Sequence, residues 1–413
     1  MLNNYISYNN SVFNKYIIIT SVLVVFYPLK GLLNLTYYFF QYESIPGVFN
    51  KFVFIILLLS LSTLFLCNKF KIKKYWLHTF FTVTAITMSL ISNDRTLLYQ
   101  IFLLLVLPIL FSIFDDLPPK YGEKIIKSFF KFTLIYMLIE YILLNIKIEG
   151  GYLISPDLYQ SFYSLISPGG LTIDHRHRGS WQIVRSGGFL ADPLAMSALV
   201  VMSSTYFYIN YRLYKRNIFY TLIGIFLVIS GISVTAIATL AFTTLVFEIH
   251  HNKLWKAIIT TTVLFYLVTL HPTFDYVYYR TTEHVIFNSG YWIRFFNFDF
   301  MYELKTYLYL ILGCWNWYGC GADSHVDLLL IPLSMGIIGF YILYKIFLKG
   351  FIFYRSKKSI FTIYSYILLS AFVCLYHHAM TLSLNIMIIV VFVSGQIKIP
   401  PRADIALLKQ SKI

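Results

Sequence analysis

Residues 218–249 read IFYTLIGIFLVISGISVTAIATLAFTTLVFEI, and this stretch decides how the whole chain folds. It is too long for one membrane-spanning helix, which needs about 20 residues, and short for two. Its middle, SGISVTAIATLAFTT, is rich in small residues that permit a tight turn or close helix contact. We therefore weigh one long helix against two short ones, 218–231 and 233–249.

Basic residues on both sides favour two helices. RLYKR precedes the stretch and HHNKLWK follows it. A single crossing would place these two basic loops in opposite compartments, whereas two crossings keep both in the cytoplasm, as the positive-inside rule prefers. We expect two crossings.

The composition is that of a polytopic membrane protein. Of the 413 residues, 58% are hydrophobic and 12% are charged, and the mean hydropathy is +0.69. The formal net charge of +15 could suggest nucleic acid, but most Lys and Arg residues fall in loops that we assign to the cytoplasm. We expect an all-α fold of about twelve spans, with no nucleic-acid partner. The expected spans are 16–40, 51–67, 76–92, 96–114, 129–146, 189–210, 218–231, 233–249, 257–271, 327–344, 360–376 and 379–397.

Two segments on the opposite side of the membrane are much longer than the other loops. These are 147–188 and 272–326, within a single polytopic domain 1–413 that has both termini in the cytoplasm. Loops of this length are uncommon without a function. We therefore expect the active site on the external face.

The first long loop carries three arginines, Arg176, Arg178 and Arg185. A cation at a membrane boundary often only contacts lipid headgroups, but basic residues are otherwise sparse on this side. The planar fork of arginine suits two-point capture of phosphate. We predict phosphate contact for all three.

Arg185 begins the segment RSGGFLADPLAM. Gly187 and Gly188 would let the backbone approach a ligand. Asp192 can cap the helix that follows, and Pro193 suits its first turn. The segment predicts a loop that enters a helix beside a bound anion.

The second long loop ends in GADSHVDLLLIPLSMGIIGF, residues 321–340. His325 is flanked by Asp323 and Asp327, which could orient the imidazole and raise its basicity. A neutral imidazole can accept a proton from a sugar hydroxyl, although a lone histidine here is often only an interfacial residue. Ligands two residues apart with no second cluster make a weak zinc signal, so we expect neither metal nor cofactor.

Three further features leave alternatives open. Glu140, in LIYMLIEYILL, is a mid-helix charge that either serves a functional site or hydrogen-bonds to a neighbouring helix. Cys314 and Cys320 could form a disulfide on the external side. Tryptophans in the external loops could stack on sugar faces or belong to interfacial belts and lipid-facing surface; these are Trp181, Trp292, Trp315 and Trp317.

The pairing of RSGGFLADPLAMSALVV with the later SHVDLLLIPLSMGIIGF resembles the superfamily of bacterial O-antigen polymerases (Wzy type) and O-antigen ligases. In that family an Arg- and Gly-containing segment ending in Glu/Asp-Pro leads into a span. A Ser/Thr-rich helix pair follows, and then a long external loop with arginines that ends in a histidine before a Gly-rich helix. The order agrees over about residues 185–340.

The resemblance implies a glycosyltransferase of the GT-C type in the bacterial inner membrane. Its donor would be an undecaprenyl-pyrophosphate-linked oligosaccharide on the periplasmic face, and a chain-length regulator would be a partner. The resemblance implies catalytic roles for His325, Arg185 and Arg294, and a weaker phosphate contact for Arg280. Fixed arginines suit a departing pyrophosphate without metal.

Polymerase, ligase and flippase are the competing functions. Val326 stands where asparagine often follows the histidine in the family, and this departure favours polymerase over a ligase that transfers polymer to lipid A-core. A flippase or exporter would favour internal repeats and several charges within the bilayer. Here the charges gather in the external loops. We therefore expect an O-antigen polymerase.

Overall fold

The computed structural model describes residues 119–148, 151–152, 173–178, 181–190, 193–231, 233–251, 304–315, 327–353, 360–374 and 384–397, with isolated residues between 76 and 91 and between 255 and 262. Those isolated residues are helical. The expected spans 16–40, 51–67 and 96–114 lie outside the described residues.

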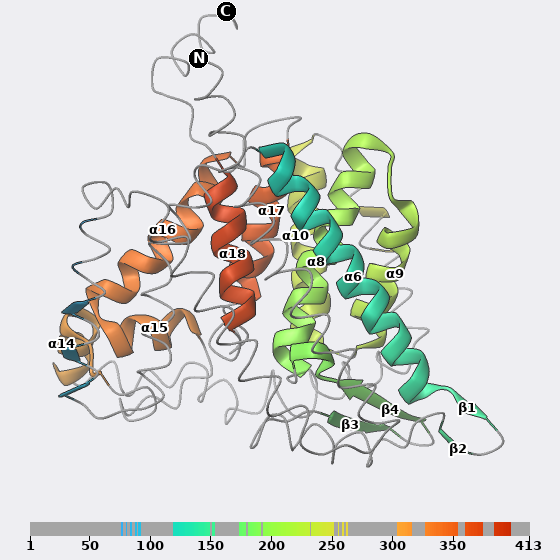
Figure 1. Cartoon of the computed structure of the whole chain (residues 1–413), viewed down its shortest axis with the longest axis horizontal. Helices are drawn as coiled ribbons and strands as arrows, with labels where there is room; N and C mark the ends of the chain where they lie inside the picture. The colour runs from blue at the N-terminus through green and yellow to red at the C-terminus, as the bar shows by residue number, and fades with distance from the viewer. Residues whose placement is uncertain are drawn as a thin grey trace, which may run out of the picture.

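The described chain is predominantly helical, as expected, with α8 at the centre of a helix bundle (Figure 1). Helix α8 packs against α6, α9, α10 and α17, and α17 also packs against α16 and α18. Among the residues that the structure describes, no helix meets the combined length and hydropathy that a membrane crossing requires. The bundle helices are α6 (Pro119–Asn145), α8 (Pro193–Tyr214), α9 (Ile218–Ser230), α10 (Val234–His250), α16 (Ile337–Phe353), α17 (Ile360–Cys374) and α18 (Leu384–Gln396).

The stretch 218–249 forms two helices, as the sequence predicted. Helix α9 ends at Ser230, and α10 begins at Val234. The Ser233 side chain accepts a hydrogen bond from the backbone N–H of Ala236 at 3.3 Å, which satisfies one of the free donors at the start of α10. A short turn therefore separates the two helices.

Helices α8 and α9 form a tight antiparallel pair. Asn217 adopts a left-handed conformation, with φ 66°, at the start of α9. The Thr221 hydroxyl donates to the carbonyl of Phe207 at 3.0 Å. A Cβ on Gly224 would lie 2.6 Å from the Ser204 hydroxyl oxygen, so the two backbones approach closely at a pair of small residues.

The expected single span 327–344 is wrong, because the helix breaks at Gly336. This residue has φ +59° and separates α15 (Asp327–Met335) from α16. A Cβ there would lie within 3 Å of backbone atoms of Ile311 and Gly313. The break lets the end of α14 (Leu304–Leu312) pack directly on the turn.

The contact between α14 and α15 is built from backbone groups. The N–H groups of Cys314 and Trp315 donate to the carbonyls of Leu333 and Ser334, each at 3.0 Å. Trp315 is buried, and its indole N–H donates to Leu312 at 2.8 Å. Trp315 therefore packs against the protein and is not presented to a sugar. Cys314 is disulfide-bonded, and Cys320 lies outside the described residues.

Helix α6 begins ten residues before the expected span 129–146. Pro119 suits the first position of a helix, because its missing N–H would have no partner there. Ile125, Ile126 and Phe129 are buried at the spacing of one helix face. The lysines between them give this first part of α6 the composition of a cytoplasmic loop, which explains the missed helix.

Candidate functional site

Within the segment 147–188, the described residues form two antiparallel hairpins that the sequence analysis did not anticipate. Strand β1 (Lys147–Ile148) pairs with β2 (Gly151–Tyr152) at the end of α6. Strand β3 (Ile173–Arg178) pairs with β4 (Trp181–Ser186). In Figure 1 both hairpins lie at one end of the bundle, where α8 begins. Three predicted phosphate ligands are therefore on β3 and β4.

The register of β3 and β4 gathers these arginines on one face. Asp174 is paired with Arg185, Arg176 with Ile183, and Arg178 with Trp181. Paired positions share a face, and positions two residues apart along a strand share it too. Arg176, Arg178 and Arg185 therefore occupy one face of the hairpin, with Asp174 among them. We call this the arginine face.

Two histidines occupy the other face of the same hairpin. His175 is paired with Val184, and His177 with Gln182. These positions alternate with the arginines along β3, so the two faces differ in chemistry. The histidines provide natural controls for the arginines.

A buried aromatic residue fixes the hairpin to the bundle. Strand β4 leads into the short 3-10 helix η2 (Gly188–Leu190), whose Phe189 is fully buried. Its ring packs against Phe129, Phe132 and Tyr136 of α6 at centroid distances of 5.4–6.3 Å. This contact holds the end of β4 at the start of α8.

Gly187 and Gly188 lie in a closely packed part of the structure. Both are buried, and Gly188 has φ +55°, which favours glycine. A Cβ on Gly188 would lie 2.8 Å from the Met137 sulfur and 2.9 Å from Met196. Gly188 therefore brings η2 against both α6 and α8.

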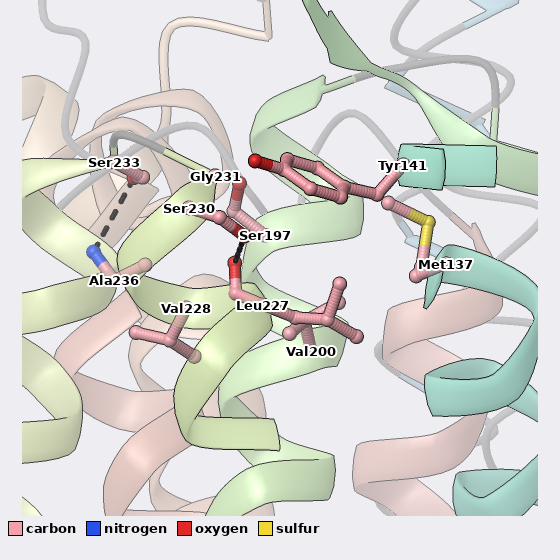
Figure 2. Close-up of a pocket in the computed structure, with 10 residues that line it drawn as sticks. All are labelled: Met137, Tyr141, Ser197, Val200, Leu227, Val228, Ser230, Gly231, Ser233 and Ala236. Atoms are coloured by element: carbon pink, nitrogen blue, oxygen red, sulfur yellow. Dashed lines mark hydrogen bonds between the residues drawn. The ribbon is translucent and has the colours of Figure 1, made fainter. Parts of the chain in front are cut away.

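A small pocket lies at the same end of the bundle (Figure 2). Its lining comes from the last turns of α6, the first turns of α8 and the α9–α10 turn. Figure 2 shows the Tyr141 ring reaching from α6 toward Ser230 and Gly231. The residues that line it are Met137, Tyr141, Ser197, Val200, Leu227, Val228, Ser230, Gly231, Ser233 and Ala236.

Hydroxyl groups make up the polar part of this pocket. Ser197 donates to the carbonyl of Pro193 at 2.7 Å, and Ser230 donates to that of Leu227 at 3.5 Å. The Tyr141 ring packs edge-on against Phe226, with centroids 5.2 Å apart. The sequence analysis noticed the small residues around Ser230 but did not predict that they line a pocket.

Glu140 lies next to Tyr141 in α6 and is buried, with 1% of its surface exposed. A carboxylate in such a position is normally hydrogen-bonded or paired, and Glu140 does make such an interaction. Its position near the hairpin end of α6 keeps it a candidate site residue.

The remaining predicted site residues fall in less completely described parts of the chain. Asp327 is the first residue of α15. The predicted residues Arg280, Arg294, Asp323 and His325 lie outside the described residues, as does Asp192. In the described part of the chain, no group of three or more His, Cys, Asp or Glu side chains is placed to hold a metal ion.

The hairpin that carries the arginine face and the pocket thus lie at the same end of the bundle, where α8 begins. No protein-family model, curated protein or solved structure matches this chain.

Proposed function

We propose that this chain is an O-antigen polymerase, an integral membrane glycosyltransferase of the bacterial inner membrane. It joins undecaprenyl-pyrophosphate-linked oligosaccharide repeat units at the periplasmic face. The observation that carries the proposal is the arginine face, which groups three arginines on one face of the hairpin that leads into α8.

A membrane environment is supported by the distribution of side chains over the helices. Apolar side chains point outward along α6 and α9, including Ile139 and Leu222, which are 47% and 60% exposed. Polar side chains such as Thr205, Thr243 and Ser370 are buried between the helices. Small and polar residues between helices, with apolar ones outside, are typical of a bundle in lipid.

The arginine face suits a pyrophosphate leaving group. When a sugar hydroxyl of the acceptor attacks the anomeric carbon, the bond to the pyrophosphate breaks and negative charge grows on the departing oxygen. Arg176, Arg178 and Arg185 would stabilise that charge, since preorganised cations act most strongly where charge develops. The hydroxyl proton passes to a base, for which we propose His325.

Deletion of the gene tests the proposal at the level of the cell. Lipopolysaccharide from the deletion strain should retain core molecules bearing a single repeat unit and lose the long ladder on a gel. Loss of every repeat-bearing band would instead support the ligase or the flippase. An unchanged ladder would contradict all three functions.

Substitution of Arg185 tests the proposed role of the arginine face. Arg185→Ala should abolish the ladder while the protein still accumulates in the membrane. Arg185→Lys should restore it poorly, because lysine lacks the two-point geometry. His177→Ala, in the same hairpin but on the other face, is the matched control and should retain the ladder. Full activity of Arg185→Ala would contradict the role of this residue.

A further inference from the structure

Among the residues that the structure describes, no charged side chain lines the pocket between α6, α8 and the α9–α10 turn. The described lining side chains are all neutral, and most of the lining surface is apolar. An anion buried there would lack a cation, which makes pyrophosphate an unsuitable occupant. The pocket therefore suits an uncharged group.

The hydroxyls of the pocket can both donate and accept hydrogen bonds. Ser233 uses its oxygen to accept from the Ala236 N–H, which leaves its hydrogen available to a ligand. Ser230 donates its hydrogen to Leu227, which leaves its oxygen as an acceptor. The Tyr141 hydroxyl, which reaches toward Ser230 and Gly231 in Figure 2, can act as donor or acceptor. A matching ligand has one N–H or O–H and one carbonyl or hydroxyl oxygen.

Val200, Leu227 and Val228 supply an apolar wall beside these hydroxyls. These side chains are almost fully buried. A methyl group of the ligand packed against them would itself leave water, which is worth roughly 0.8 kcal/mol for each buried CH₂ group. Water alone would satisfy the hydroxyls but not the apolar wall.

The size of the pocket limits the occupant to a few atoms. Its cavity volume is about 40 Å³, well below the roughly 150 Å³ of an engineered cavity that holds benzene. The pocket therefore admits only a small group. A prenyl segment of similar size would offer no acceptor to the hydroxyl hydrogens of Ser233 and Tyr141, which is unfavourable.

We propose that this pocket binds the acetamido group of an N-acetylated sugar. The methyl group lies against Val200, Leu227 and Val228. The amide N–H donates to Ser230, and the carbonyl oxygen accepts from Tyr141 and Ser233. This inference rests on the proposed function only for the identity of the larger ligand, since the pocket lies at the same end of the bundle as the arginine face that would hold the lipid pyrophosphate.

Saturation-transfer NMR on the full purified chain in detergent tests this site with free N-acetylglucosamine, and with glucose as the comparison sugar. The acetyl methyl protons should receive more saturation than the ring protons, and glucose should receive little. Equal saturation of the two sugars, or none of either, would overturn the proposal.

Two variants locate the binding. Ala236→Leu adds bulk to the pocket and should remove the methyl signal. Tyr141→Phe deletes one oxygen and should weaken binding by about threefold to tenfold. Tyr211→Phe, at the far end of α8, is the matched control and should bind like the parent. An unchanged signal in Ala236→Leu and Tyr141→Phe would place the sugar elsewhere and overturn the assignment.

The outcome is separable from that of the proposed function. The NMR measurement needs neither a lipid-linked donor nor polymerisation, so it can succeed in a chain whose deletion leaves lipopolysaccharide unchanged. Conversely, loss of the ladder on deletion, combined with equal binding of both sugars, would retain the polymerase and reject the acetamido subsite.

Discussion

Arg212 of α8 and Glu248 of α10 form a two-point ion pair in the bundle. The Nε of Arg212 lies 2.6 Å from Oε1 of Glu248, and Nη2 donates to Oε2 at 2.8 Å. Tyr208 also donates to Oε1 at 3.0 Å. Glu248 is fully buried, while Arg212 retains partial exposure. The charge contact at Nε and the hydrogen bond from Nη2 join α8 to α10 through this carboxylate.

Removal of one partner of this pair should destabilise the protein. Arg212→Met leaves the Glu248 carboxylate buried without its cation, which should lower the free energy of unfolding by roughly 3 kcal/mol. Tyr208→Phe removes a single hydrogen bond and should cost about 1 kcal/mol. Thermal unfolding of the detergent-solubilised protein measures both.

The double variant Arg212→Met/Glu248→Leu should recover much of the loss, because a buried ion pair contributes little over apolar residues of similar volume. A double variant no more stable than Arg212→Met alone would contradict this expectation. It would show that the ion pair stabilises the fold more than apolar residues of similar volume do.

Gly336 and Gly188 should differ in their response to alanine, although both have positive φ. At Gly336 the added Cβ meets fixed backbone of α14, and at Gly188 it meets the flexible side chains of Met137 and Met196. Left-handed strain and overpacking together should cost Gly336→Ala about 3 kcal/mol.

Gly188→Ala should lower the unfolding temperature less than Gly336→Ala. The exposed neighbour Ile337 provides the control, since Ile337→Ala removes no buried contact and should change the unfolding temperature little. Equal unfolding temperatures for the two alanine variants would contradict this argument. They would show that a Cβ against backbone costs no more than a Cβ against flexible side chains.

The close approach of α8 and α9 can be tested with a compensating pair. Gly224→Ala places a Cβ against Ser204 and should destabilise the pair of helices by about 1–3 kcal/mol. Ser204→Gly in the same chain should relieve the contact, so the double variant should be more stable than the sum of the two single changes predicts. If the destabilisation of the double variant equals the sum of the two single effects in thermal unfolding, the two residues are not in tight contact, and the assigned close approach is wrong.

The two faces of the β3–β4 hairpin should differ in their effect on polymer length. Arg176→Ala and Arg178→Ala each remove a cation from the arginine face, so we expect a shortened or absent ladder. His175→Ala and His177→Ala alter the same strand on its other face and should leave the ladder intact. Lipopolysaccharide gels with matched membrane protein levels measure this, and equal loss from arginine and histidine variants would contradict the register argument.

The helices were predictable wherever hydropathy and length determine them. The two helices of 218–249 follow from small residues at the turn and basic loops on both sides. Glu248 was overlooked as a core residue although it falls within the expected span 233–249, because it lies at the end of that span, close to His250 and His251 of the basic loop. Its partner Arg212 likewise reads as a loop cation, and only tertiary packing brings the two together.

The hairpin was missed although a local signal existed. Gly179-Ser180 stands between two runs containing β-branched and aromatic residues, and a leading glycine is typical of two-residue hairpin turns. The many charges in IDHRHR masked this signal. The pocket could not be predicted, because its lining combines α6 with residues far along the chain in α9 and α10.

Arginine and histidine alternate along β3. The register of this strand, as well as its residue types, therefore determines which side chains share a face with Arg185. Phe189 fixes the end of β4 against α6, so a shift of the whole of β3 by one residue against β4 would place His175 and His177, instead of Arg176 and Arg178, on the face that carries Arg185. A shift of two residues would restore the original faces. The chemistry of this face therefore depends on the register of the hairpin as much as on its residues.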